Sequence, residues 1–310
     1  MVLLFPGQGS QKSGMGKDLA TAFPEARAVF EQADDALGRP LSALCFGGPE
    51  EELTSTENAQ PALLAHGAAA WAVVRTRLAA HVRAAAGHSL GEFTAYHAAG
   101  ALTLRDALRL VRRRGELMLE SGRRRPGAMA AILGASESIV EAACSRATSE
   151  SGTVVPANYN TPEQLVISGE IDAVERAMEL CREGGAKRAL RLNVSGAFHS
   201  PLMEVASAGL REALAATPMG PVAFPVYSNV TSLPARDVAD TRRLLHRQLT
   251  SPVRWTDEVR QLVEARPDAL FVEVGPGAVL SNLVRRIAPS VTTTTCGTPS
   301  DVESLLRRVA

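Results

Sequence analysis

Apolar and polar positions divide most of the chain into short apolar runs and longer segments with helical spacing. Runs of strand length occupy residues 2–5, 81–86, 222–228, 270–274 and 291–297. Segments with apolar residues three and four positions apart separate them, at 23–37, 41–46, 59–78, 93–99, 103–120, 200–217, 238–250, 256–266 and 278–287. Strands that alternate with helices are typical of a parallel sheet covered by helices. The pattern predicts an α/β fold with a parallel sheet core, in which residues 47–55 form an acidic loop.

The middle of the chain has a different order of elements. After a Gly/Arg/Pro-rich linker at 121–127 come strand 128–133, helix 136–148, strands 153–159 and 164–168, helix 171–184 and strand 186–192. This β-α-β-β-α-β order is the ferredoxin-like signature. We therefore predict a small ferredoxin-like subdomain at residues 126–194, inserted into a large domain formed by residues 1–125 and 195–310.

The motif Gly87-His88-Ser89-Leu90-Gly91 lies between an apolar run and a helical segment. A serine in a tight strand-to-helix turn presents its hydroxyl outward, and flanking glycines relieve the crowding there. The following helix directs backbone N–H groups and its positive dipole end toward whatever the serine attacks. The same residues also fit a glycine-rich turn with a helix-capping serine, so the motif alone leaves both interpretations open.

The glycine-rich loop at residues 7–9 follows the first predicted strand and raises the question of nucleotide binding. A dinucleotide-binding fingerprint requires a third glycine where this chain has Lys12. The pair Gly16-Lys17 lacks the second glycine and the Ser or Thr of a P-loop. Both nucleotide-binding patterns therefore fail.

Charge and cysteine content exclude several classes of partner. The chain has 33 basic and 33 acidic residues, so net charge favours neither nucleic acid nor a membrane surface. The four cysteines are scattered without metal-ligand spacing, which indicates no metal site and a reduced setting. The N-terminal apolar run is too short for a signal peptide, and no apolar run reaches membrane-spanning length. We expect a cytoplasmic protein.

A serine nucleophile needs a base, and the chain offers six histidines. His199 lies in the loop Gly196–Pro201, where the chain leaves the predicted small domain. Loops at such junctions are where α/β folds place reacting groups. His88 adjoins Ser89, so its side chain should diverge from the serine. The other histidines are interpreted as surface or core residues: His66, His81, His97 and His246.

A conventional triad would also need a carboxylate that orients the histidine. Asp106 and Asp172 lie early in predicted helices and fit helix capping, whereas Glu92 and Glu273 are less easily dismissed. A backbone carbonyl could orient the histidine instead, because it also accepts the ring N–H.

Separated motifs along essentially all 310 residues carry a resemblance to a known family. They are Phe5-Pro6-Gly7-Gln8-Gly9-Ser10-Gln11, Gln60-Pro61-Ala62, Gly87-His88-Ser89-Leu90-Gly91-Glu92, Arg114-Gly115, Asn158-Tyr159-Asn160, Gly196-Ala197-Phe198-His199-Ser200, Gln248-Leu249-Thr250-Ser251-Pro252-Val253 and Glu273-Val274-Gly275-Pro276-Gly277. Each motif alone is weak, but the set in this order resembles the malonyl-CoA:acyl carrier protein transacylases of fatty acid synthesis. It is also similar to the acyltransferase domains of polyketide synthases. The resemblance implies that the large domain is α/β-hydrolase-like.

The resemblance also implies catalytic roles. Ser89 would carry the acyl group and His199 would be its base. The backbone carbonyl of Gln248 would orient the histidine. The backbone N–H groups of Gln8 and Leu90 would form the oxyanion hole.

Arg114 carries the implied substrate preference. A buried guanidinium facing Ser89 would pair bidentately with the free carboxylate of malonyl, which a lysine could not do. Its neighbours Arg112 and Arg113 are expected to be solvated. Phe198 resembles the residue of malonyl-selective members, where methylmalonyl-accepting polyketide enzymes tend to have serine. The other implied substrate-binding residues are Met118, Gln60 and Asn158.

The implied activity is that of an [acyl-carrier-protein] S-malonyltransferase, which works by ping-pong transfer through acyl-Ser89. Its partners would be malonyl-CoA and an acyl carrier protein, with no nucleic acid, membrane, metal or bound cofactor, and we expect a monomer. The small domain would help to bind the carrier, and carrier proteins are acidic, so basic residues in this domain and in the linker before it are candidate contacts. These are Arg123, Arg124, Arg125, Lys187, Arg188 and Arg191.

Three other functions compete with this interpretation. A discrete acyltransferase serving a polyketide assembly line would use the same chemistry. A serine thioesterase or lipase-like hydrolase would share the elbow, but it has no use for Arg114 and would profit from a triad acid. A non-catalytic carrier-binding module would require the pair of Ser89 and His199 to be a coincidence.

Overall fold

The computed structural model describes residues 1–309, and its larger part is built on a parallel four-stranded sheet. The strand order is β2 (Ala84–Gly87), β1 (Val2–Phe5), β7 (Phe271–Val274) and β8 (Thr293–Cys296). Every residue of β1, β2 and β7 is buried, as expected for parallel strands covered on both faces. The predicted α/β fold with a parallel core is confirmed.

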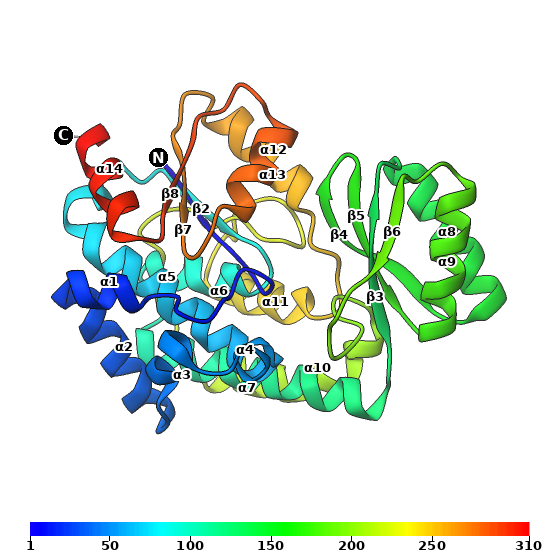
Figure 1. The fold of residues 1–310 in the computed structure, drawn as a ribbon, viewed down its shortest axis with the longest axis horizontal. Helices are drawn as coiled ribbons and strands as arrows, with labels where there is room; N and C mark the ends of the chain where they lie inside the picture. Colours follow the sequence, from blue (N-terminus) through cyan, green and yellow to red (C-terminus); the bar gives the residue numbers. More distant parts are fainter. Residues whose placement is uncertain (310) are drawn as a thin grey trace.

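Helices surround this sheet (Figure 1). The central one is α5 (Thr56–Leu78), whose alanine-rich sequence lets neighbouring helices approach closely, so that most of its residues are buried. The other helices of this part are α1 (Lys17–Ala22), α2 (Pro24–Leu37), α3 (Leu41–Gly47), α4 (Glu50–Thr54), α6 (Leu90–Ala98), α7 (Leu104–Arg124), α10 (Glu204–Ala216), α11 (Val238–Gln248), α12 (Trp255–Ala265), α13 (Val279–Ile287) and α14 (Pro299–Val309), with 3-10 turns at Ala79–His81 and Pro201–Met203. Among residues 1–309, no helix combines the length and apolar character needed to cross a membrane.

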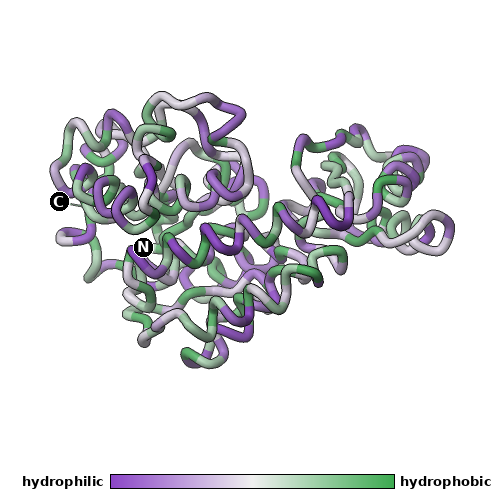
Figure 2. Tube along the Cα trace, turned by 90° about the horizontal axis from the view of Figure 1, so that it is seen from below, coloured by the Kyte–Doolittle hydropathy of each residue, from purple (hydrophilic) through white to green (hydrophobic). Residues whose placement is uncertain are grey.

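A second, antiparallel sheet forms a separate unit at one end of the molecule (Figures 1 and 2). Its strands, in the order β4-β5-β3-β6, are β3 (Ala128–Leu133), β4 (Val154–Thr161), β5 (Gln164–Gly169) and β6 (Arg188–Arg191). Helices α8 (Glu137–Ser151) and α9 (Ile171–Glu183) pack together and share an apolar core with the sheet. This is the predicted ferredoxin-like subdomain. We call residues 126–194 the small domain and the rest the large domain.

Side-chain alternation gives the small sheet two distinct faces. Ala130 and Ile132 of β3 belong to the core beneath α8 and α9, whereas Met129 and Ala131 line a cavity. Successive residues of a strand point to opposite faces. The face away from the helices is thus available to form one wall of a site against the large domain.

Several details differ from the sequence-based expectation, and helix α1 (Lys17–Ala22) is one that was not predicted. Residues 222–228 form no regular strand and contribute only single bridges, because Pro221 and Pro225 lack the N–H groups that a ladder needs. The acidic loop at 47–55 contains α4, whose first turn consists of glutamates that favour a helix N-terminus. Helix α7 continues through the predicted linker to Arg124, and α14 was not predicted.

Candidate active site

The structure places Ser89 in the turn between β2 and α6, with φ 52° and ψ −105°. A positive φ is uncommon for a residue other than glycine, and such strain costs about 1–3 kcal/mol. Gly87 and Gly91 lie so close to neighbouring backbone that neither has room for a Cβ. The Ser89 side chain makes no capping hydrogen bond to α6, which excludes the helix-capping interpretation.

His199 faces this serine. Its Nε2 lies 2.7 Å from Ser89 Oγ, and its Nδ1 lies 2.9 Å from the backbone carbonyl oxygen of Gln248. A carbonyl can only accept, so Nδ1 carries the proton and Nε2 is free to accept the serine O–H. Burial, together with the nearby charge of Arg114, lowers the pKa of His199 to about 3. The imidazole is therefore neutral at physiological pH and ready to act as a base.

Arg114 of α7 points its guanidinium at the same hydroxyl and is only 1% exposed. Nη2 donates to Ser89 Oγ at 3.1 Å and to Gln248 Oε1 at 2.9 Å, while Nη1 donates to Gln60 Oε1 at 2.7 Å. Burial lowers the pKa of Arg114 to about 10, opposed by the carboxylate of Glu92. The group remains a cation at neutral pH, held in one orientation by two glutamines.

The two arginines before it differ from each other. Arg113 is half-exposed, as predicted. The prediction of a solvated Arg112 is wrong, because its Nη1 donates to the backbone oxygen of Glu57 and to Asn58 Oδ1. Successive helix positions point in different directions, and position 112 faces the start of α5 rather than solvent.

A cavity of about 410 Å³ separates the two domains in front of Ser89. Ser89, Leu90, Arg114, Met118, Phe198 and His199 line it from the large domain, and Met129, Ala131, Asn158, Asn160, Gln164, Val166 and Leu192 line it from the small domain. Three of the four residues implied beside Arg114 thus reach the cavity. The fourth, Gln60, is not part of the wall but bonds Arg114 and, through Nε2, the sulfur of Met118.

Gln8 and Leu90 both lie at this cavity next to Ser89. Within residues 1–309, neither backbone N–H donates to another protein group. Leu90 begins α6, so its N–H also lies at the positive end of a helix dipole. Two free donors beside a nucleophile are what a developing oxyanion requires.

The remaining candidates are structural. His88 diverges from Ser89 and lies 2.8 Å from Asn160 Oδ1, as predicted. Asp106 takes part in capping α7, since its N–H donates to Thr103 Oγ1 at 3.1 Å. Glu273, which sequence left open, accepts from the N–H groups of Leu280 and Ser281 at the start of α13. No group of metal-ligating side chains occurs in the part of the chain that the structure describes.

Sequence reasoning missed two residues behind the serine. Asn229 and Glu258 are completely buried, and the Asn229 side chain accepts from the backbone N–H of Ser89 at 2.7 Å. Glu92, which sequence left open, is also buried and accepts from Gln248 Nε2 at 2.7 Å. The only signal for Asn229 was its place directly after the apolar run at 222–228.

A strained serine at a strand-to-helix turn, with a neutral histidine as its base, defines a serine-nucleophile enzyme of α/β-hydrolase-like fold. The comparisons with known proteins narrow this class. Residues 2–298 match the family model described as acyl transferase domain. A malonyl CoA-acyl carrier protein transacylase of Bacillus subtilis (strain 168) is 44% identical over 305 residues, covering 98% of this chain and 95% of that protein.

Solved structures agree. An acyl-carrier-protein-S-malonyltransferase from Bartonella henselae superposes with a TM-score of 0.94 at 41% identity, over 99% of this chain and 98% of the other. A malonyl-transacylase in complex with a type II PKS acyl-carrier protein gives 0.94 at 40% identity, over 99% of each chain. The chain belongs to the acyl transferase family, among its malonyl CoA-acyl carrier protein transacylases.

Proposed function

We propose that the protein transfers malonyl from malonyl-CoA to the phosphopantetheine thiol of an acyl carrier protein through malonyl-Ser89. The observation that carries this proposal is the buried cation of Arg114, which donates to Ser89 Oγ. Nη1 of Arg114 has one hydrogen bonded to Gln60 and a second one free, and Nη2 has one hydrogen bonded to Ser89 Oγ. The free Nη1 hydrogen and this Nη2 hydrogen together suit the two oxygens of a bidentate carboxylate. An uncharged acyl group would leave the positive charge of this buried guanidinium without an anionic partner.

The first half-reaction forms an ester. Ser89 Oγ attacks the thioester carbonyl while His199 Nε2 takes the hydroxyl proton. The N–H groups of Gln8 and Leu90 stabilise the oxyanion, and its collapse breaks the C–S bond. The departing thiolate takes the proton from His199 and leaves as free CoA.

The second half-reaction runs the same steps with a different nucleophile. The carrier thiol gives its proton to His199 and attacks the ester carbonyl of malonyl-Ser89. Collapse of the tetrahedral intermediate returns the proton to Ser89 Oγ and releases malonyl-carrier. No step needs a metal or cofactor, and we expect the enzyme to act as a cytoplasmic monomer.

A serine hydrolase remains the alternative of a different class. It shares the Ser89–His199 pair, but the backbone carbonyl of Gln248 stands where a hydrolase triad has a carboxylate. Incubation with malonyl-CoA alone separates the two: the transferase stops at one malonyl per protein, whereas a hydrolase releases free malonate continuously.

The pathway is a second question. The relatives include fatty-acid-type transacylases and the partner of a type II PKS carrier protein. We propose fatty acid synthesis. Single-turnover transfer from malonyl-enzyme to a panel of purified carriers tests this, and faster transfer to a polyketide carrier would assign the enzyme to polyketide synthesis.

Intact-mass measurement after exposure to malonyl-CoA tests the central proposal. We expect one malonyl adduct on the native protein and none on Ser89→Ala. Ser168→Ala is a matched control, because Ser168 is buried in the small domain and its Oγ has no partner within the described chain. An adduct that persists on Ser89→Ala would overturn the assignment.

A further inference from the structure

The backbone of Ser89 is strained, so neighbouring groups must hold it. The carboxamide of Asn229 does this at two points: Oδ1 accepts from Ser89 N–H at 2.7 Å, and Nδ2 donates to the carbonyl of Gly87 at 2.7 Å. The Asn229 amide thus bridges His88, and it fixes the peptide group before His88 and the peptide group after it. A backbone N–H can only donate and a carbonyl can only accept, so the orientation of the amide is determined.

Glu258 of α12 completes this arrangement. Its Oε2 accepts the second Nδ2 hydrogen of Asn229 at 2.9 Å. Both Nδ2 hydrogens and the Oδ1 of the Asn229 carboxamide are thus engaged. Gln248 Nε2, which donates to the Ser89 carbonyl at 2.9 Å and to Glu92 Oε2 at 2.7 Å, lies 3.3 Å from the same Oδ1. Because both Asn229 and Glu258 are fully buried, water cannot replace a lost partner.

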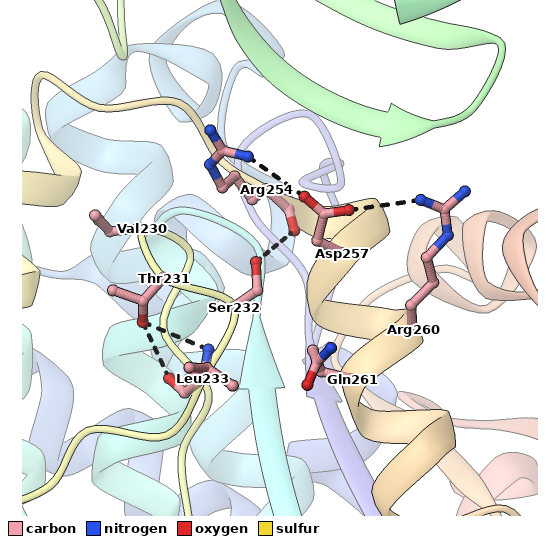
Figure 3. A pocket seen from close by; sticks show the side chains of 8 residues that line it. All are labelled: Val230, Thr231, Ser232, Leu233, Arg254, Asp257, Arg260 and Gln261. Atoms are coloured by element: carbon pink, nitrogen blue, oxygen red, sulfur yellow. Dashed lines mark hydrogen bonds and ion pairs between the residues drawn. The ribbon is translucent and has the colours of Figure 1, made fainter.

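The loop that carries Asn229 is closed on itself and bonded to Arg254, the residue directly before α12. The backbone N–H of Arg254 donates to the carbonyl of Asn229 at 3.0 Å, and Ser232 N–H donates to Ser228 O at 2.8 Å. Figure 3 shows residues 230–233 lying beside the start of α12, with Ser232 directed at the Arg254 carbonyl. Asn229 is therefore anchored on α12 rather than on a free surface loop.

We propose that Asn229 is a positioning residue for the nucleophile: oriented by Glu258, its amide holds the Ser89 backbone so that Oγ points at His199. Neither Asn229 nor Glu258 lines the substrate cavity. Changes at Asn229 should therefore slow the attack by Ser89 and leave the binding of malonyl-CoA unaltered. The proposal rests on acyl transfer through Ser89, the proposed function.

Two readouts keep the tests separable. The first is the single-turnover rate of Ser89 malonylation at varied malonyl-CoA, which yields the rate constant and the apparent affinity. The second is the rate at which an arylsulfonyl fluoride sulfonylates Ser89 Oγ and releases fluoride. This reaction needs the serine to be activated as a nucleophile, but it does not need recognition of malonyl. Native protein that is labelled but never malonylated would refute the proposed function and leave the role of Asn229 to be judged by labelling.

For Asn229→Ala we expect both rates to fall about 10- to 100-fold, as for loss of one or two buried hydrogen bonds. The apparent affinity for malonyl-CoA should change less than about threefold, since this variant leaves the binding cavity intact. Asn58→Ala is the matched control: Asn58 is a buried amide that also bonds a backbone oxygen, that of Glu52, and accepts from Arg112. It should lower Tm without lowering the labelling rate of folded protein.

Asn229→Asp should make the labelling rate depend on pH, which a residue with a merely structural role would not do. When ionised, the introduced carboxyl group cannot donate to the carbonyl of Gly87. It would also face the carboxyl groups of Glu258 on α12 and Glu92 on α6. The other titratable neighbours are Tyr96 on α6 and, beyond Gln248, Arg114. When protonated, the same group could again donate to Gly87 while accepting from Ser89. The labelling rate of this variant should thus recover toward that of the native protein as pH falls from 8 to 5, while Asn229→Ala should not recover.

Two results would overturn the proposal. One is Asn229→Ala that is labelled within twofold of the native rate. The other is Asn229→Asp whose pH profile runs parallel to that of Asn229→Ala.

Discussion

Arg114 and His199 both bond the hydroxyl of Ser89, from Nη2 at 3.1 Å and Nε2 at 2.7 Å. The Arg114 cation donates to the serine oxygen, while the neutral His199 imidazole accepts a hydrogen bond from the serine O–H. Both side chains are buried, with exposed fractions of 1% and 4%. In the proposed mechanism, recognition of the acyl group and activation of the nucleophile thus meet at one oxygen atom.

Arg114→Ala should exchange the substrate preference of the enzyme. Losing the buried partner of a substrate carboxylate costs about 2–5 kcal/mol, or roughly 30- to 5,000-fold in kcat/KM for malonyl-CoA. Acetyl-CoA, which has no carboxylate, should lose nothing or gain. Parallel single-turnover assays with both thioesters measure the ratio. Arg113→Ala, on the half-exposed neighbour, should leave it unchanged; equal losses for both thioesters in Arg114→Ala would contradict a role in selectivity.

The pH dependence of the Ser89 malonylation rate should not show the titration of a histidine with an ordinary pKa of about 6.5. Burial and Arg114 lower the pKa of His199 to about 3, so the base stays neutral down to mildly acidic pH. Burial raises the pKa of Glu92 to about 7, so Glu92 is a buried group beside the site whose titration falls in this range. We therefore expect Glu92→Gln to give a constant single-turnover rate from pH 5 to pH 8. A fall with a midpoint near 6.5 in that variant would show that His199 titrates normally.

Glu258→Gln should stabilise the fold increasingly as pH rises. Burial, and then the charge of Glu92, raise the pKa of Glu258 well above its ordinary value of 4.5. Above pH 4.5 the unfolded chain releases this proton and the folded chain keeps it, so the native protein loses stability with rising pH. Glutamine does not titrate and avoids this loss. Thermal melts at pH 4.5 and pH 8 check the prediction, with roughly 2 °C in Tm for each kcal/mol; a difference independent of pH would contradict it.

Phe198→Ser should admit larger extender units. The Phe198 ring lines the cavity next to the catalytic histidine, so its removal makes room for the methyl group of methylmalonyl. We expect the ratio of kcat/KM for methylmalonyl-CoA to that for malonyl-CoA to rise about tenfold, in line with one methyl in a fitted pocket. Competition between the two thioesters, read by intact mass, measures the ratio. An unchanged ratio would place the limit on substrate size elsewhere in the cavity.

Reversal of charge at Lys187 and Arg188 should weaken the carrier half-reaction. Both are exposed, and neither forms an ion pair within residues 1–309, whereas Arg124, Arg125 and Arg191 do. The double change to glutamate should raise KM for the carrier about threefold or more and spare that for malonyl-CoA. The same reversal at Arg307 and Arg308 of α14, on the far side of the large domain (Figure 1), is the control. Equal effects on both substrates would refute this docking surface.

Local chemistry explains why much of the fold could be predicted. The buried strands are continuous apolar runs, and the elbow depends on glycines at fixed spacing around Ser89. The prediction of a strand at 222–228 was wrong because the composition of this run suits a strand, whereas Pro225 within it and Pro221 just before it interrupt the ladder. Propensity describes side chains, and sheet formation also depends on free N–H groups.

The sequence predicted those site residues that lie within recognisable motifs. Ser89, His199 and Arg114 belong to recognisable motifs. Asn229 and Glu258 come from segments without any motif, and their pairing arises from the way α12 packs behind the elbow. A sequence read alone shows no such packing, because the partners lie far apart along the chain.

The strand order has a consequence for how the enzyme is made. β1 pairs with β7, so the first strand synthesised must wait for residues 271–274 before its ladder is complete. Ser89 and Arg114 likewise leave the ribosome long before His199, Asn229 and Gln248. Domains fold as units once their long-range contacts can form. In the proposed mechanism, a nascent chain therefore holds Ser89 without its base, and we expect no acylation by malonyl-CoA until residues up to about 274 have left the ribosome and folded.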